Sequence, residues 1–230
     1  MAQSVIAVIN QKGGVGKTTT AVSLAACLHS KKSPALVLDA DPQGSAVGWS
    51  RMGDGFGFAV EAVDLTSDGA ARALKQTIAS HDGHVVIDCP PEAKQPAAVA
   101  AALADLVLIP VSASGLDVMA TKRATDLVLD ARSMLGGERP RALLVATKFD
   151  RTAIARDMAQ MLRGFIGEAD FDQLNPDGPA VAATRIANLV PLRECTASGL
   201  TIVQYQPKGK SAQEYRALAK EVLKQIKQGE

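Results

Sequence analysis

The sequence has 230 residues, of which 47% are hydrophobic and 3% aromatic, and its formal net charge is +1. This length allows one α/β domain with a sizeable core, built from Val, Ile, Leu and Ala because aromatic side chains are few. The balanced charge of the whole chain predicts no particular partner.

In chain order, short apolar runs alternate with helical patterns. We expect strands over residues 4–9, 35–38, 84–87, 106–109, 141–147 and 180–183. We expect helices over residues 18–30, 70–80, 97–104, 116–135, 154–165 and 211–227, and loops with short elements over residues 45–70. This alternation predicts an α/β fold with a doubly wound, mostly parallel sheet flanked by helices. The chain has no internal repeat or long linker, so residues 1–230 should form a single domain.

The cysteines and the apolar runs exclude several classes of protein. Cys27, Cys89 and Cys195 lie far apart, without a CxxC or Cys/His cluster, so we expect reduced cytoplasmic thiols and no zinc site. Residues 1–3 lead directly into a strand pattern, and we expect no signal peptide. No apolar run approaches the roughly 20 residues that span a bilayer.

A glycine-rich segment follows the first predicted strand. Apolar strand, Gly-rich turn and Gly-Lys-Thr are typical of a phosphate-binding loop, whose backbone N–H groups close around phosphate oxygens at a helix N-terminus. Lys17 would reach the β- and γ-phosphates, and the Thr18 hydroxyl would ligate Mg²⁺. The expected nucleotide-binding residues are Lys12, Gly13, Gly14, Val15, Gly16, Lys17, Thr18 and Thr19.

This segment departs from the ordinary phosphate loop. Gln11 stands where the first glycine is required, and Lys12 precedes the glycine pair. The segment resembles the deviant Walker A motif of the ParA/MinD family of P-loop ATPases, and is most similar to the small ParA-type partition ATPases. The resemblance implies ATP and Mg²⁺ as cofactors, and a homodimer in which Lys12 reaches the partner's phosphates. A lysine in isolation is by default a solvated surface group, which is the alternative reading of Lys12.

Two carboxylate segments end predicted strands, where ligands of such sheets bind. Residues 39–43 (Asp-Ala-Asp-Pro-Gln) resemble the family's Walker A′ segment, which implies that Asp41 positions the attacking water while Asp39 supports the metal and the loop. A helix cap or turn is the alternative. Asp88 ends an apolar run, as in a Walker B strand that holds Mg²⁺ through a water. We therefore expect Lys12, Lys17 and Asp41 to act in catalysis and Thr18, Asp39 and Asp88 to serve the metal.

Two later segments have weaker signals. Residues 147–150 (Thr-Lys-Phe-Asp) end a predicted strand and are either a plain turn or, as in related NTPases, a contact to the nucleotide base. Residues 185–230 hold eight Lys/Arg against four Glu, a local net charge of +4, and follow the motif order of the ParA branch. The resemblance implies DNA binding without sequence preference, with a steep salt dependence, by the ATP-bound dimer. The candidate residues are Arg185, Arg193, Lys208 and Lys210.

The basic residues of the last predicted helix have two interpretations. Lys220, Lys224 and Lys227 lie opposite a Leu218/Val222/Ile226 stripe, so they are DNA contacts or simply a solvated helix face. A MinD-like membrane ATPase would use such a helix to insert into lipid. Here the stripe is short, aliphatic and without Trp or Phe, so we do not expect a membrane partner.

Taken together, the motifs predict a nucleotide-binding site, and the resemblance to the ParA family implies an ATP-dependent dimerising switch that binds DNA and positions or segregates a plasmid, a chromosome or a protein assembly. We expect slow ATP hydrolysis, stimulated by a ParB-like or other adaptor, and a cytoplasmic, nucleoid-associated protein without the N-terminal helix-turn-helix domain of larger ParA proteins. Two enzyme classes fit less well. Nitrogenase-type reductases need cluster-binding cysteines, and Cys89 follows Asp88 too closely for that role. A Rossmann dehydrogenase needs glycine where Thr19 stands.

Overall fold

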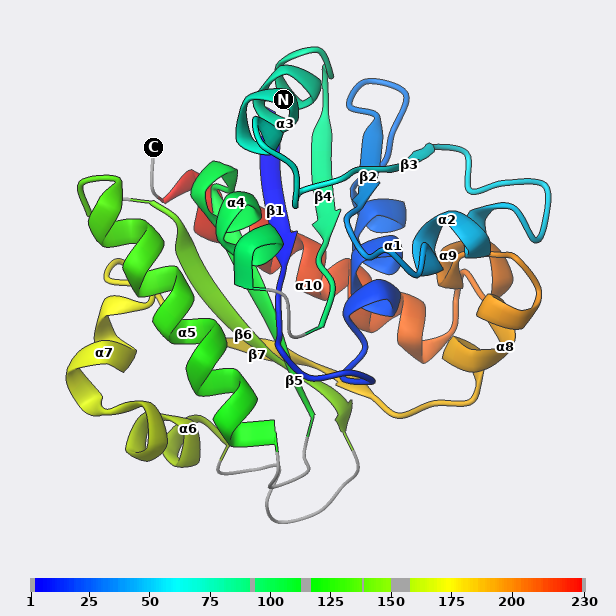
Figure 1. Cartoon of the computed structure of the whole chain (residues 1–230). Coiled ribbons are helices and arrows are strands. Elements are labelled where there is room, and N and C mark those ends of the chain that lie inside the picture. Colours follow the sequence, from blue (N-terminus) through cyan, green and yellow to red (C-terminus); the bar gives the residue numbers. More distant parts are fainter. Residues whose placement is uncertain (1–2, 92–93, 113–116, 138, 150–157, 229–230) are drawn as a thin grey trace.

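The computed structural model describes residues 3–91, 94–112, 117–137, 139–149 and 158–228. In these residues seven parallel strands form one sheet in the order β3-β2-β4-β1-β5-β6-β7 (Figure 1). The strands are β1 (Ser4–Val8), β2 (Ala35–Asp39), β3 (Ala59–Ala62), β4 (His84–Asp88), β5 (Leu106–Ser112), β6 (Arg141–Phe149) and β7 (Val181–Ala187). The doubly wound fold predicted from the alternation of elements is confirmed.

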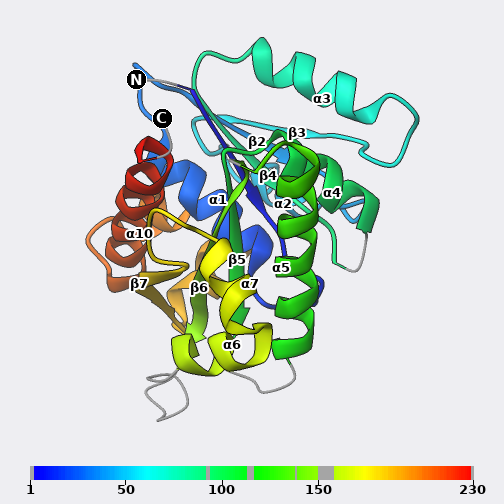
Figure 2. The ribbon, with the colours of Figure 1, turned by 90° about the vertical axis from the view of Figure 1, so that its left-hand side faces the viewer.

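The helices cover both faces of this sheet. They are α1 (Lys17–Leu28), α2 (Ser45–Ser50), α3 (Ala70–Ala79), α4 (Lys94–Leu103), α5 (Asp117–Met134), α6 (Met158–Ile166), α7 (Glu168–Gln173), α8 (Pro191–Ala197), α9 (Ile202–Tyr205) and α10 (Lys210–Lys227). Figure 2 shows α1 and α10 on one side of the strands, with α4 and α5 on the other. None of the helices in the described ranges is both long and apolar enough to cross a membrane.

Alternation along each strand divides the core into two clusters. Val5, Ala7 and Ile9 pack with α3 to α7, whereas Ile6 and Val8 pack with α1, α2 and α8 to α10. Successive side chains of a strand point to opposite faces, so a strand buried on both sides is apolar at every position. This is why β1 and β4, in which every residue is buried, contain the apolar runs 5–8 and 85–87.

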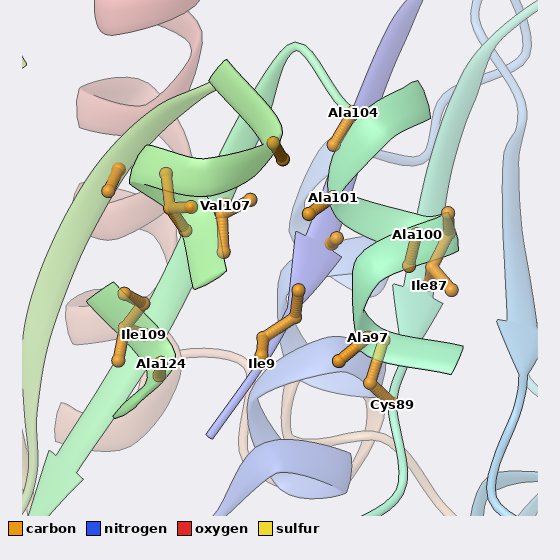
Figure 3. Packing of buried hydrophobic residues seen from close by; sticks show 14 of the residues in the cluster. Ile9, Ile87, Cys89, Ala97, Ala100, Ala101, Ala104, Val107, Ile109 and Ala124 are labelled. Atoms are coloured by element: carbon orange, nitrogen blue, oxygen red, sulfur yellow. The ribbon is translucent and has the colours of Figure 1, made fainter. Parts of the chain in front are cut away.

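Helix α4 packs closely on the centre of the sheet because its inward face consists of small side chains. Ala97, Ala100, Ala101 and Ala104 are at most 4% exposed and belong to the same cluster as Ile9, Ile87 and Cys89 (Figure 3). Alanine costs no side-chain entropy in a helix and lets the backbone approach the strands. This packing supports the carboxyl ends of β1 and β4, where the candidate site lies.

The connections place β1 at the switch point of the sheet. The chain runs from β1 to β2 and β3 on one side, returns to β4 next to β1, and then crosses to β5 on the other side. In open α/β sheets the crevice at such a point, outside the carboxyl ends of the strands, is the usual ligand site. The loop after β1 occupies this position.

Several elements differ from the sequence-based expectation. Strand β3 and helices α7, α8 and α9 were not predicted as separate elements, because each spans only four to seven residues and has little periodicity of its own. Residue 116 and residues 154–157, which were expected in helices, lie outside the described residues.

Candidate nucleotide site at the carboxyl edge of the sheet

The glycine-rich loop joins β1 to α1. Gly14 and Gly16 have φ of 76° and 91°, a left-handed conformation that residues with a Cβ rarely adopt. A Cβ at Gly13, Gly14 or Gly16 would meet no atom within 4 Å, so the space above these glycines is open. Helix α1 begins at Lys17, and its first backbone N–H groups adjoin the same space. The loop has the shape of a cradle for phosphate oxygens.

Two strands hold this loop through polar contacts of Asn10 and Thr147, a role that the sequence analysis did not assign to either residue. Asn10 donates from Nδ2 to the Pro110 carbonyl oxygen of β5 at 2.7 Å, and its Oδ1 accepts from the backbone N of Lys12 at 3.0 Å. Thr147, on β6, donates from its hydroxyl to the Val15 carbonyl oxygen at 2.8 Å. The sequence did contain a signal for these contacts, namely a polar residue near the carboxyl end of a buried strand. Burial of a polar side chain costs free energy unless the side chain has a hydrogen-bond partner.

Lys17 has a buried side chain, only 7% exposed, and its Nζ donates to the Lys12 carbonyl oxygen at 3.0 Å. Burial lowers the pKa of Lys17, while the nearby Asp88 and Asp41 carboxylates raise it. A buried ammonium gains from any further anion, so this group favours binding of a phosphate.

Asp88 ends β4 as a carboxylate that is 1% exposed. Among the described residues neither of its oxygens has a hydrogen bond of ordinary geometry. Burial raises the pKa of Asp88 to about 7, an effect that the adjacent Thr18 hydroxyl and the Lys17 ammonium only partly oppose. A buried carboxylate without partners is costly, and a bound cation would offset this cost. Thr18 and Asp88 therefore fit a Mg²⁺ ion.

Asp39, beside Asp88 in the β2–β4 register, has a different environment. Its Oδ1 accepts from the backbone N of Asp41 at 3.2 Å, and its Oδ2 accepts from those of Ala46 and Val47 at 2.9 and 3.0 Å. The carboxylate thus satisfies the first N–H groups of α2. These contacts match the helix-cap interpretation of Asp39. A contribution of Asp39 to metal binding remains a prediction. In the described part of the chain no three His, Cys, Asp or Glu side chains form a preformed metal cluster.

Asp41 lines a cavity of about 670 Å³ together with Lys17 and Thr18. Its Oδ1 accepts from the backbone N of Gln43 at 2.9 Å, which fixes the turn after β2. The cavity therefore brings a carboxylate to the same space as the loop glycines, although the two segments are over 20 residues apart in sequence. Lys12 is half-buried and does not appear in the described lining of this cavity.

The far wall of the cavity comes from β6, β7 and α8. Thr147 and Lys148 contribute to it, and Lys148 has φ of 51°, the only positive value among described residues other than glycine. Asp150, the last residue of that sequence segment, lies outside the described residues. Arg193 also lines this wall, which sequence reasoning assigned to DNA instead.

The other candidate DNA contacts lie away from this cavity lining. Arg185 is exposed on β7, Lys208 is exposed before α10, and Lys210 forms an ion pair with Glu214 at 3.6 Å. On α10 the side chains of Leu218, Val222 and Ile226 are buried against the domain, and the three lysines opposite them are exposed. The helix packs on its own domain, as the sequence analysis preferred.

Comparison with known proteins shows the family to which the chain belongs. A family model described as an AAA domain matches residues 3–53. The chromosome-partitioning ATPase Soj of Thermus thermophilus is 31% identical, with 97% of this chain and 96% of that protein aligned. The maintenance of carboxysome distribution protein A of Halothiobacillus neapolitanus is 32% identical over 90% of each chain.

Among solved structures, the septum site-determining protein MinD of Pyrococcus horikoshii, complexed with Mg-ADP, has the same fold. Its TM-score is 0.67 at 19% identity, with 96% of each chain covered. The predicted P-loop NTPase fold is thereby confirmed. Because the likeness to Soj extends over nearly the whole of both proteins, the chain belongs to the ParA family of partition ATPases.

Proposed function

We propose that this ATPase is a nucleotide-dependent dimerising switch that binds DNA without sequence preference and positions or segregates a cargo. The observation that carries the proposal is the environment of Asp88, a buried carboxylate beside Lys17 and Thr18 of the phosphate loop whose oxygens have no hydrogen bond of ordinary geometry among the described residues. Such a group is costly in a nucleotide-free protein and becomes favourable when a cation bound to a triphosphate lies next to it.

Each residue of the site has a role in this proposal. The N–H groups of the loop and the Lys17 ammonium bind the phosphates, Thr18 and Asp88 hold Mg²⁺, and Asp39 fixes the segment that carries Asp41. Asp41 orients the attacking water. Bound Mg²⁺ would supply neutralisation of the charge on the phosphates, the main requirement of phosphoryl transfer.

Lys12 is the residue that links nucleotide binding to dimerisation in this proposal. Its side chain is not part of the cavity lining in its own subunit, which supports a role on the phosphates of a second copy. ATP would then join two subunits, and hydrolysis would separate them. Slow basal turnover, stimulated by a ParB-like or other adaptor, would let the dimer persist.

The dimer would place two basic surfaces side by side on DNA. Arg185, Lys208 and Lys210 are exposed or near the surface, and neutralising several DNA phosphates makes binding depend steeply on salt. We propose a cytoplasmic, nucleoid-associated protein in which residues 1–230 act as one ATPase domain. The named relatives move chromosomes or carboxysomes, so the cargo is either DNA or a protein assembly.

The test is retention on non-specific DNA, and the mass in solution, with ATP, ADP and no nucleotide. We expect a dimer and DNA retention with ATP only.

Lys17→Ala should weaken ATP binding by roughly a hundredfold, since it removes a charge-assisted contact to phosphate. Lys12→Ala should keep ATP but remain monomeric. Lys75→Ala, at an exposed position of α3, is the matched control. Equal retention in all three conditions would reject the switch.

A membrane-surface role is disfavoured by α10. The apolar side chains that would enter lipid are already buried in the domain core. Sedimentation with anionic liposomes should therefore show no increase on addition of ATP. ATP-dependent pelleting would instead require α10 to leave the domain, and would favour the MinD-like alternative.

A further inference from the structure

The candidate nucleotide cavity is lined by two chemically different groups of residues. The first group contains the phosphate-loop glycines, Lys17 and Thr18. The second group contains the apolar side chains of Ile186, Leu189 and Leu192, from the end of β7 and the segment through α8. A volume of about 670 Å³ is typical of pockets that enclose a whole small ligand. The apolar group therefore suits the faces of a base, and the first group suits the phosphates.

Arg193 lies next in the chain to a member of the apolar group. It neighbours Leu192 in the first turn of α8, and Leu192, Arg193 and Thr196 all line the cavity. None of the ion pairs or side-chain hydrogen bonds found within the described residues engages its guanidinium. A guanidinium can stack on an aromatic ring or donate to hydroxyl and ring-nitrogen acceptors, which makes it suited to a base and a ribose.

The rest of the fold holds α8 in a fixed position. Cys195 is fully buried, and Thr201 and Gln204 form a capping box in the next turn. Gly199 packs against Gly53 so closely that a Cβ on Gly199 would lie 2.4 Å from the Gly53 nitrogen. Such a support fixes the backbone of Arg193 beside the cavity before any ligand binds, although the side chain itself is exposed.

We propose that Arg193 contacts the base and ribose of the bound nucleotide, and that it is a nucleotide-binding residue rather than a DNA contact. The inference rests on the proposed function, because it assumes that this cavity takes ATP. A residue that touches nucleotide is covered in the ATP-bound state. That state is the one expected to hold DNA, so Arg193 is not available to DNA phosphates when DNA binds.

The test compares dissociation constants for ATP, ADP and inorganic tripolyphosphate, with the emission of Trp49, the single tryptophan, or calorimetry as the readout. Arg193→Ala should weaken ATP and ADP by a similar factor, about tenfold, and leave tripolyphosphate unchanged. The KM for ATP should rise by a similar factor, because the lost contact is to the base and ribose. Arg193→Lys, which keeps the charge but not the planar fork, should recover only part of the affinity. Arg72→Ala, at an exposed position of α3, should have no effect on binding.

Three outcomes would overturn the inference. If Arg193→Ala leaves nucleotide affinity unchanged but weakens DNA retention, Arg193 is a DNA contact. A loss for ATP and tripolyphosphate without a loss for ADP would make it a γ-phosphate contact. Unchanged binding of every ligand would remove it from the site. If Arg193→Ala does not fold, as judged by circular dichroism, Arg193→Gln and Arg193→Lys give the same comparison. Failure of the unmodified protein to bind ATP or tripolyphosphate would instead reject the proposed function itself.

Discussion

Trp49 of α2 donates from its indole nitrogen to the carbonyl oxygen of Leu200, in the turn between α8 and α9, at 3.1 Å. The same two regions meet again where Gln204 donates to the Gly55 carbonyl oxygen at 3.0 Å. Helix α2 directly follows the segment that carries Asp41, and α8 carries Arg193. The two walls of the nucleotide cavity are therefore tied together behind the cavity by contacts about 150 residues apart in sequence.

Gly199 should be one of the least replaceable residues of this tie. Its φ is +64°, and a Cβ would lie 2.4 Å from the Gly53 nitrogen and 2.6 Å from the Met52 carbonyl carbon. Gly199→Ala should therefore lower the unfolding free energy by about 2–4 kcal/mol, since overlap adds to backbone strain. Gly55→Ala is the matched control, with φ of +85° but open space around a Cβ. It should cost about 1 kcal/mol. Urea unfolding measures both, and equal losses would show that packing at Gly199 contributes nothing.

Asp39 and Asp41 should separate stability from chemistry. Asp39→Ala removes the acceptor for two backbone N–H groups at the start of α2 and for that of Asp41 in the preceding turn, and should lower the unfolding free energy by about 1–3 kcal/mol. Asp41→Ala should leave stability within about 0.5 kcal/mol while abolishing hydrolysis, so that the ATP-bound dimer persists on DNA. Thermal unfolding and phosphate release measure the two effects. A stable Asp39→Ala protein would contradict the capping role.

The Asp88 carboxylate should lower the stability of the nucleotide-free protein and should be required for hydrolysis. Its folded-state pKa of about 7 lies above the ordinary value of 3.8, so the stabilising contribution of the protonated form is complete below pH 3.8 and is lost as the pH rises through 7. At pH 8 Asp88→Asn should therefore raise the unfolding free energy of the nucleotide-free protein by about 2–4 kcal/mol. The variant should also lose Mg²⁺-dependent hydrolysis. Asp54→Asn, at an exposed position, should change neither quantity. Destabilisation by Asp88→Asn would mean that the carboxylate has a structural partner.

His84 should make the opposite contribution to pH dependence. Burial lowers the pKa of His84 below 6.5, and nearby His81 adds to this effect. Its contribution to stability is complete above pH 6.5 and is lost as the pH falls towards the lowered folded-state value, because only the unfolded chain then takes up a proton. His84→Gln should reduce the loss of unfolding free energy between pH 7 and pH 5, by up to about 1.4 kcal/mol for each pH unit. Urea unfolding in an Asp88→Asn background isolates this group. Identical pH profiles with and without His84 would contradict the prediction.

Much of the fold could be predicted from the sequence because its signals are local. A short β-branched run such as residues 85–87 is typical of a strand buried on both faces, and the alternation of such runs with helices predicts the parallel sheet. The phosphate loop is also local, since its glycines, its lysine and the following helix adjoin in the chain. The sequence therefore determined the fold class, and it predicted the position of the loop at the end of the first strand.

Only the tertiary structure decided which distant groups share a space. Asp39 accepts from the backbone N of Ala46, seven residues later, because the chain folds back after β2. Thr147 donates to the Val15 carbonyl oxygen because β6 ends near the phosphate loop. Arg193 in sequence is one basic residue in a segment of net charge +4, and that charge alone favours DNA. Its location in the cavity depends on where α8 packs, and the turn that follows α8 contacts residues about 150 positions away, such as Trp49. The contacts of these side chains are determined by burial and long-range packing, which cannot be inferred from a short sequence pattern.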